Sequence, residues 1–308
     1  ELAAWEVFEE AKPWREADAD VAEAVDFLEY YAGEMEQLDP PPRLGRYPGE
    51  LNELFWSPRG VTVVIAPWNF PLAIPAGMVA AALVSGNPVL FKPSERASTM
   101  GYRLATILRQ AGVPAGVLQY VPGGPDVGRE LVTQASVATI AFTGSKDVGL
   151  GMVQAAAVQQ PGQKFVKRVI AEMGGKNAII VDDTADLDEA VTGVVQSCTG
   201  YAGQKCSACS RVILLDSIHD AFIQRLADAV MSLRIGAAED PATQVGPVID
   251  GRAQKRIRDY LEIGRREGRV VVDRSMEGPG HAVGPVVIAG IEPTHRLAQE
   301  EIFGPVLA

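Results

Sequence analysis

Hydrophobic positions in the first part of the chain predict a helix followed by a buried strand. From Asp18 to Leu38 apolar residues recur every three or four positions, which is the period of an amphipathic helix. Three prolines, residues 40–42, end that pattern. Residues 61–66 are almost all apolar, as in strands that are covered on both faces of a parallel sheet. A further strand is predicted over residues 51–56.

Downstream of residue 66 the chain repeats the order helix, strand. The predicted helices cover residues 71–85, 96–111, 125–134 and 146–158, and the strands between them cover 88–91, 117–121 and 137–142. Helices of this length between short apolar strands indicate βαβ units, so we expect an α/β fold with a Rossmann-like doubly wound parallel sheet. Strands over 165–171 and 178–181, a helix from Leu187 and an apolar segment over 286–288 predict a second α/β domain.

Composition restricts the partners and the location of the protein. The 308 residues are 47% hydrophobic, which is enough for one large or two medium domains. A net charge of -11 argues against binding to nucleic acid or an anionic membrane, because both need a basic surface. Apolar runs are too short for a membrane span, and the first residues lack the pattern of a signal peptide. We therefore expect a cytoplasmic protein.

The cysteines and histidines predict neither disulfides nor a metal site. Three cysteines are an odd number, and one Cys-x-x-Cys pair lacks a second pair of zinc ligands. The histidines, at positions 219, 281 and 295, are scattered. Cys198 lies in a helical pattern and is expected in the core, while Cys209 is expected to pack just beyond a turn.

Three other residues have the chemistry needed to oxidise a carbonyl group. Cys206 supplies a thiol nucleophile, Glu172 a carboxylate base, and Asn69 an amide that can donate to an oxyanion. The base would manage the proton of the nucleophile and later activate water. The alternative for Cys206 is a buried thiol without a chemical role.

Glycine-rich turns follow two of the predicted strands. Gly123 and Gly124 come after strand 117–121, and Thr143-Gly144-Ser145 comes after strand 137–142. Such turns leave backbone N–H groups free at a helix N-terminus, where a pyrophosphate can bind. Neither the Gly-x-Gly-x-x-Gly nor the Walker pattern is present, so the alternative of plain tight turns stays open.

Taken together, the motifs resemble those of the aldehyde dehydrogenase superfamily. They are Pro67-Trp68-Asn69-Phe70-Pro71, Glu172-Met173-Gly174-Gly175-Lys176, Gly203-Gln204-Lys205-Cys206 and Glu301-Ile302-Phe303-Gly304-Pro305. The resemblance implies that Cys206 attacks an aldehyde and that Asn69 and the Cys206 N–H stabilise the oxyanion. It also implies that a hydride passes to NAD and that Glu172 activates the water that hydrolyses the thioester.

The same resemblance assigns the NAD-binding residues. It implies that the turn from Phe142 to Ser145 contacts the pyrophosphate, that Lys92 and Glu95 hold the adenosine ribose, and that Glu301 and Phe303 position the nicotinamide half. A carboxylate at the ribose favours NAD over NADP. A solvated strand end is the alternative for Lys92 and Glu95. The full expected set is Trp68, Lys92, Ser94, Glu95, Gly124, Phe142, Thr143, Gly144, Ser145, Glu301 and Phe303.

Residues 165–177 and 200–208 more closely resemble the Δ1-pyrroline-5-carboxylate dehydrogenase group of that superfamily. This group oxidises L-glutamate 5-semialdehyde to L-glutamate in proline breakdown. The resemblance implies that Ser207 binds the substrate carboxylate, that Phe70 lies beside its methylene stem, and that Lys205 adds positive charge. An exposed lysine without that role is the alternative for Lys205.

The resemblance also implies a division into domains and a longer parent protein. Residues 1–39 are expected to be part of the cofactor-binding domain, 40–58 part of an oligomerisation hairpin, 59–173 the NAD-binding domain, and 174–308 an incomplete catalytic domain. The parent is expected to be a homo-oligomer, with possible fusion to a flavin-dependent proline dehydrogenase.

Two other functions stay open. One is an NAD(P)-dependent dehydrogenase for another aldehyde or semialdehyde, whereas a CoA-acylating enzyme fits less well because Glu172 is present. The other is a noncatalytic dinucleotide-binding or assembly module formed by this piece alone.

Overall fold

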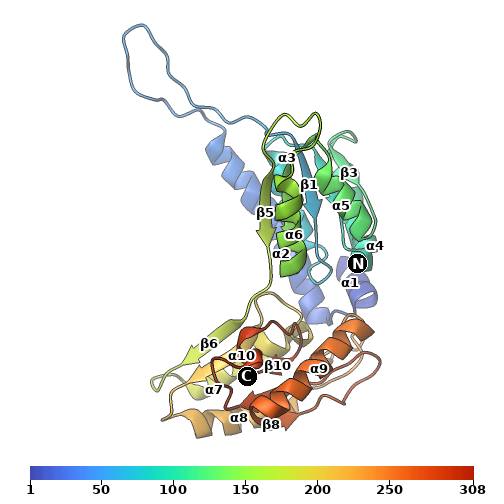
Figure 1. Ribbon diagram of the computed structural model, residues 1–308, viewed down its shortest axis with the longest axis vertical. Helices are drawn as coiled ribbons and strands as arrows, with labels where there is room; N and C mark the ends of the chain where they lie inside the picture. The colour runs from blue at the N-terminus through green and yellow to red at the C-terminus, as the bar shows by residue number, and fades with distance from the viewer. The chain divides into compact units, whose positions relative to one another are not determined.

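The computed structural model describes residues 1–308, which divide into two compact units (Figure 1). One unit comprises residues 18–173 with Leu2, and the other comprises residues 3–17 and 174–308 with Glu1. The helical pattern at the start of the chain did not indicate that residues 3–17 group with the second unit. The functional domain boundaries expected from the sequence stay a prediction.

A five-stranded parallel sheet forms the centre of the first unit. The strands are β1 (Val61–Ile65), β2 (Val89–Lys92), β3 (Leu118–Tyr120), β4 (Val137–Thr143) and β5 (Arg168–Glu172), in the order β3-β2-β1-β4-β5. β1 is central, since Val63 pairs with Leu90 on one side and with Ile140 on the other. The doubly wound parallel sheet predicted from the alternating pattern is confirmed.

Helices cover both faces of this sheet (Figure 1). They are α2 (Trp14–Leu38), α3 (Ala73–Val84), the short 3-10 helix η1 (Glu95–Ala97), α4 (Ser98–Gln110), α5 (Pro125–Thr133) and α6 (Lys146–Ala157). Val64 points to a core shared with α2, α3 and α4, whereas Val63 points to a core shared with α5 and α6. Both valines are fully buried, which explains the continuous apolar run of β1.

The predicted strand over residues 51–56 is wrong. Only an isolated antiparallel bridge joins Arg43 to Glu53, with a hydrogen bond of 3.2 Å from the Leu44 N–H to the Asn52 carbonyl. The side chain of Phe55 is 73% exposed. A strand needs a partner ladder and a buried face, and a lone two-stranded ribbon is only marginally stable in water. The apolar residues of this segment are therefore not sufficient to form a strand.

The second unit combines a mixed set of strands with helices. Its strands are β6 (Asn177–Val181), β7 (Cys209–Leu214), β8 (Arg269–Asp273), β9 (Val286–Ala289) and β10 (Val306–Leu307). β6 pairs with β7 and β9 with β10 in parallel, while β8 and β9 are antiparallel. Hydrogen bonds from Val212 N to Ala308 O (2.9 Å) and from Ala308 N to Ser210 O (3.1 Å) join β7 to the strand end after β10.

One hydrophobic core holds these strands and their helices together. The helices of this unit are α1 (Leu2–Glu10), α7 (Leu187–Thr199), η2 (Gly200–Gly203), α8 (His219–Ser232), α9 (Gly251–Glu267) and α10 (Arg296–Gln299). Phe222 from α8 and Ile257 from α9 are fully buried in the same cluster as Ile288 from β9. The second predicted α/β unit is thus present. No helix of the structure is both long and apolar enough to pass through a membrane.

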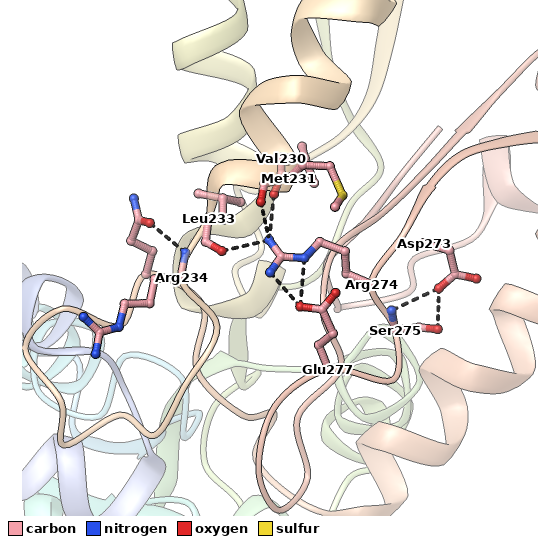
Figure 2. Close-up of polar contacts among 9 residues, drawn as sticks. Val230, Met231, Leu233, Arg234, Asp273, Arg274, Ser275 and Glu277 are labelled. Carbon is pink, nitrogen blue, oxygen red and sulfur yellow. Dashed lines mark hydrogen bonds and ion pairs between the residues drawn. The ribbon is translucent and has the colours of Figure 1, made fainter.

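The Arg274 side chain caps the carboxyl end of α8 (Figure 2). Its guanidinium donates hydrogen bonds to the carbonyl oxygens of Val230 (2.9 Å), Met231 (3.3 Å) and Leu233 (2.8 Å). It also forms an ion pair with Glu277 at 2.6 Å. The last carbonyls of a helix lack partners within the helix and carry partial negative charge, so a buried cation is well suited to them.

We expect Arg274→Ala to lower the free energy of unfolding by about 2 kcal/mol, because the half-buried carbonyls of Val230 and Leu233 lose a charged donor. The Arg274 side chain is 10% exposed, so water cannot fully replace it. Arg225→Ala is the control: it removes an exposed ion pair with Asp188 and should cost less than about 1 kcal/mol. Denaturant unfolding of the full-length variants measures both, and equal effects would contradict the role of Arg274.

Candidate active site

The expected cofactor residues of the first unit lie at the carboxyl ends of its parallel strands. Because these ends share one edge of a parallel sheet, the topology brings the residues together. The edge lies where the strand order reverses, between β1 and β4, which is the usual ligand-binding position in doubly wound sheets. The segments are 68–70 after β1, 92–95 at the end of β2, Gly124 after β3, 142–145 at the end of β4 and Glu172 at the end of β5.

The turn after β4 lies directly beside Glu172. Thr143 is the register partner of Glu172, and the Gly144 N–H donates a 3.0 Å hydrogen bond to the Glu172 carbonyl. A side chain at position 144 would meet the Phe142 ring at 2.6 Å, which favours glycine. Ser145 is the N-cap of α6, and its exposed side chain does not cap the helix. Because α6 begins three residues after the end of β4, its first N–H groups lie at this edge.

Lys92, Glu95 and Gly124 converge at the neighbouring strand ends. The Lys92 ammonium donates hydrogen bonds to Pro93 O (2.8 Å) and Gly123 O (2.9 Å). Burial lowers the pKa of Lys92, and the negative charge of Glu95 opposes that shift. A Cβ on Gly124 would lie 3.1 Å from a Glu95 carboxylate oxygen, so the exposed carboxylate lies against the turn that begins α5.

The remaining predicted residues of this edge differ in burial. Asn69 is 4% exposed, and Trp68 and Phe70 are half-buried. The Ser94 hydroxyl accepts a hydrogen bond of 3.3 Å from the Arg96 N–H, so it caps η1. That cap is a structural use of Ser94 beside the predicted one.

Cys206 lies in the second unit, in the loop between η2 and β7. Asn177 holds this loop by donating from its amide to Cys206 O (2.6 Å) and to Ala208 O (3.1 Å). Cys206 is half-buried and Ser207 is exposed. The other two thiols, Cys198 and Cys209, are each 4% exposed, as expected.

Burial also makes two of the three thiols less acidic. It raises the pKa of both Cys198 and Cys209, which disfavours their thiolate forms at neutral pH. Cys206 is thus the accessible thiol among the three. No group of three or more His, Cys, Asp or Glu side chains is arranged to hold a metal ion.

The backbone that leads to Cys206 is left-handed over three residues. The φ angles are 49° at Tyr201, 52° at Ala202 and 68° at Gly203, and all three residues are buried. This conformation costs a residue with a side chain about 1–2 kcal/mol. At Gly203 a Cβ would also lie 2.5 Å from the Gly304 carbonyl oxygen, so only glycine fits there.

Glu16 is a neighbour of the loop that the sequence did not reveal. It forms an ion pair with Lys205, and the two side chains are 21% and 20% exposed. The positive charge expected from Lys205 is therefore balanced by a carboxylate. Glu16 lies 189 positions before Lys205, in the first turn of a long amphipathic helix, and nothing in that pattern marks it.

Glu301 packs against the two glycines of the Glu172–Lys176 motif. A Cβ on Gly174 would collide with the Glu301 carboxylate, and the Gly175 N–H donates a hydrogen bond to it. Burial raises the pKa of Glu301, while this hydrogen bond and the charges of Arg256 and Lys176 oppose the shift. The glycines thus make room for a carboxylate from a distant segment.

Next to this carboxylate lies a buried ammonium. The Lys176 Nζ atom is buried and makes no hydrogen bond to the chain. Burial and the nearby Arg211 charge lower the pKa of Lys176 to about 8, against the attraction of Glu301 and Glu300.

A small cavity of about 20 Å³ lies under the loop and is lined by Gly203, Lys205, Cys209, Glu301 and Phe303 among others. This volume has room for a single water molecule. The cavity is too small to bind an aldehyde with a carbon chain.

Comparison with known proteins identifies similar sequences over the whole chain. A family model described as "Aldehyde dehydrogenase family" matches residues 1–308. The 1-pyrroline-5-carboxylate dehydrogenase of Geobacillus thermodenitrificans is 49% identical over 310 aligned positions, which cover 100% of this chain and 60% of that protein. The chain thus spans about 60% of the length of the curated relatives that it matches.

Solved structures with similar sequence identity share the fold of this chain. Proline utilization A from Bdellovibrio bacteriovorus, inactivated by N-propargylglycine, has a TM-score of 0.97 and 48% identity, over 100% of this chain and 32% of that one. A 1-pyrroline-5-carboxylate dehydrogenase from Thermus with bound NAD has a TM-score of 0.96 and 45% identity, over 99% of this chain and 60% of that one.

The shifted Lys176 predicts a pH-dependent stability. An unfolded lysine has a pKa of about 10.4, whereas the folded value is about 8. Between these two pKa values the unfolded chain binds more protons than the folded chain, so the free energy of unfolding rises with pH. Below about pH 8 the folded protein must bury a charged Lys176, and the full destabilisation from that burial is present. We expect the difference in unfolding free energy, wild type minus Lys176→Met, to increase by about 2 kcal/mol from about pH 7 to about pH 9.5. Denaturant unfolding at both pH values checks this, and a constant difference would contradict it.

Proposed function

Because this chain belongs to the aldehyde dehydrogenase family, we propose that the full-length protein oxidises L-glutamate 5-semialdehyde to L-glutamate with NAD in proline breakdown. The observation that carries the proposal is Cys206, an accessible thiol in a braced loop, within a chain that resembles named 1-pyrroline-5-carboxylate dehydrogenases. Glu172 and Asn69 supply the two other chemical groups that the reaction needs.

In the proposed mechanism the Cys206 thiolate attacks the aldehyde carbon and forms a thiohemiacetal. The Asn69 amide and the Cys206 N–H donate hydrogen bonds to its oxyanion, and one such donor changes a rate by about 10²–10³-fold. A bound NAD would supply the acceptor for the hydride that leaves the carbon. Glu172 then takes a proton from a water molecule that attacks the Cys206 thioester, which releases the carboxylate product and restores the thiol.

The carboxyl edge of the first unit fits NAD. The N-termini of α5 and α6 offer backbone N–H groups to a pyrophosphate, although Asp126 and Asp147 in their first turns reduce the positive field. The Glu95 carboxylate beside Gly124 can accept hydrogen bonds from ribose hydroxyls and would repel a 2′-phosphate. In the second unit, Glu301 and Phe303 would contact the nicotinamide half. The NAD-bound Thermus relative supports this assignment.

We also propose that the protein is a cytoplasmic homo-oligomer. Within residues 40–58, Leu51, Phe55 and Trp56 are 78%, 73% and 64% exposed, and contiguous exposed apolar residues commonly mark an interface. Fusion to a flavin-dependent proline dehydrogenase is compatible with the proline utilization A neighbour, of which this chain covers 32%.

One observation favours a second candidate, the oxidation of another aldehyde. Glu16 balances the charge of Lys205, so Lys205 attracts a substrate carboxylate less than an unpaired lysine would. Ser207 would then carry most of the recognition of the substrate carboxylate within this chain.

We expect the full-length protein to show a higher kcat/KM for L-glutamate 5-semialdehyde than for uncharged aliphatic aldehydes. Ser207→Ala should raise KM for that substrate and leave kcat nearly unchanged, because a carboxylate anchor binds ground state and transition state alike. An aldehyde panel with NAD, monitored by NADH absorbance, measures both. A preference for an uncharged aldehyde would favour the second candidate.

Glu172→Gln should separate the two half-reactions. The first NADH per site should still form, because with NAD as hydride acceptor acylation needs no base once Cys206 is a thiolate, but turnover should stop at the thioester. Rapid mixing shows the burst, and mass spectrometry shows the acylated Cys206. Cys206→Ala is the control, with neither burst nor acyl group but with NAD still bound. Loss of the burst together with turnover would instead place Glu172 in thiol activation.

A further inference from the structure

Tyr201 connects the loop of Cys206 to the start of the chain. It lies five residues before Cys206 and is fully buried. Its hydroxyl donates a 3.0 Å hydrogen bond to the backbone carbonyl of Glu10, at the end of α1. The ammonium of Lys12 lies 5.4 Å from the centre of its ring, and Lys12 forms a fully buried ion pair with Glu6 at 3.2 Å.

The other end of the left-handed run is held by Gln204. Its amide nitrogen donates to Tyr201 O at 3.2 Å, and its amide oxygen accepts from Ile249 N at 2.9 Å. Gln204 is fully buried, and Gly203 is in contact with the Gly304 backbone. The run from Tyr201 to Gly203 is therefore restrained from several directions.

These restraints are needed because tyrosine and alanine disfavour the left-handed region. Such conformations persist only where the surroundings enforce them. If Tyr201 returned to the right-handed or extended region, every atom that follows it would move, and Cys206 follows within five residues. The contact of the phenol oxygen with Glu10 opposes that return, because the hydroxyl can reach the carbonyl only while the ring stays in its pocket.

We propose that Tyr201 is a positioning residue for Cys206. Its hydrogen bond to Glu10 maintains the left-handed turn that presents the thiol to the substrate. The catalytic part of this inference rests on the proposed function, while the effect on the thiol itself does not.

Thiol labelling tests the inference without aldehyde or NAD. In the full-length protein, Tyr201→Phe keeps the ring and removes only the hydroxyl. Iodoacetamide should then label Cys206 severalfold faster, because the relaxed loop exposes the thiol, while Cys198 and Cys209 stay protected in the core. Peptide mass spectrometry reads the three thiols separately. Faster labelling of all three would indicate general destabilisation and would overturn the inference, as would an unchanged rate at Cys206.

Rapid-mixing kinetics test the catalytic consequence. A displacement of about 1 Å can cost about a hundredfold in rate, so the rate constant of the NADH burst should fall at least about tenfold in Tyr201→Phe. The burst amplitude counts the folded sites, so partial misfolding does not alter the rate constant. A rate constant within about twofold of wild type would overturn the inference. If wild type forms no NADH with any aldehyde, the proposed function fails, and the labelling result still tests the role of Tyr201.

Two further variants complete the test. Tyr120→Phe is a matched control, because its hydroxyl also donates to a backbone carbonyl, that of Ser98 at 2.9 Å, in the other unit. It should leave the burst and the labelling of Cys206 unchanged, and an equal loss in both variants would overturn the inference. Adding Ala202→Gly to Tyr201→Phe should restore part of the burst rate, since glycine adopts the left-handed conformation without strain. If Tyr201→Phe does not fold, the double variant is compared with Ala202→Gly alone, which keeps the hydroxyl. Faster labelling of Cys206 and a lower burst rate constant in the double variant would support the inference, and equal rates in the two variants would overturn it.

Discussion

The nucleophile loop depends on a close approach of two backbone segments. Gly203 lies so near the Gly304 carbonyl oxygen that a side chain cannot fit between them. This contact joins the loop of Cys206 to the segment that carries Glu301 and Phe303, which are far away in the sequence. A second close approach, of the Glu301 carboxylate to Gly174, joins that segment to the chain that follows Glu172. At Gly203 and Gly174 glycine is therefore required because there is no room for a side chain, and not only because of backbone flexibility.

Strain and restraint balance each other around Cys206. Two non-glycine residues in the left-handed region cost about 1–2 kcal/mol each. One neutral hydrogen bond contributes about 0.5–1.5 kcal/mol, so the Tyr201–Glu10 bond alone does not offset that strain. The bonds of Gln204 and Asn177 and the burial of Tyr201 must contribute as well. A loop held by several weak contacts can lose one of them and still fold, while the position of its thiol changes.

The sequence predicted the elements whose evidence is local. β1 and the helices that alternate with the strands are encoded by apolar runs and periods of a few residues, and they are present. The strand over 51–56 was wrong because pairing depends on a partner ladder that a local pattern does not contain. The strand ends also placed Lys92, Glu95 and Gly124 near one another, because parallel topology determines which edge they share. Glu16 and Tyr201 were missed because both act through contacts more than 180 positions away.

Glu16 and Tyr201 were missed for the same physical reason, which does not apply to the sequence motifs. Residues 3–17 group with residues 174–308, so Glu10, Lys12 and Glu16 meet a loop nearly two hundred positions downstream. Glu6 and Lys12 are fully buried charges, which are costly unless paired, and a helical pattern read alone would place them in solvent. Burial of such a pair next to the Tyr201 ring means that the start of the chain is not a peripheral extension. It packs against the loop of Cys206 and helps to determine its conformation. Substitutions at Glu6 or Lys12 should therefore affect the reactivity of Cys206 as well as the stability of the unit.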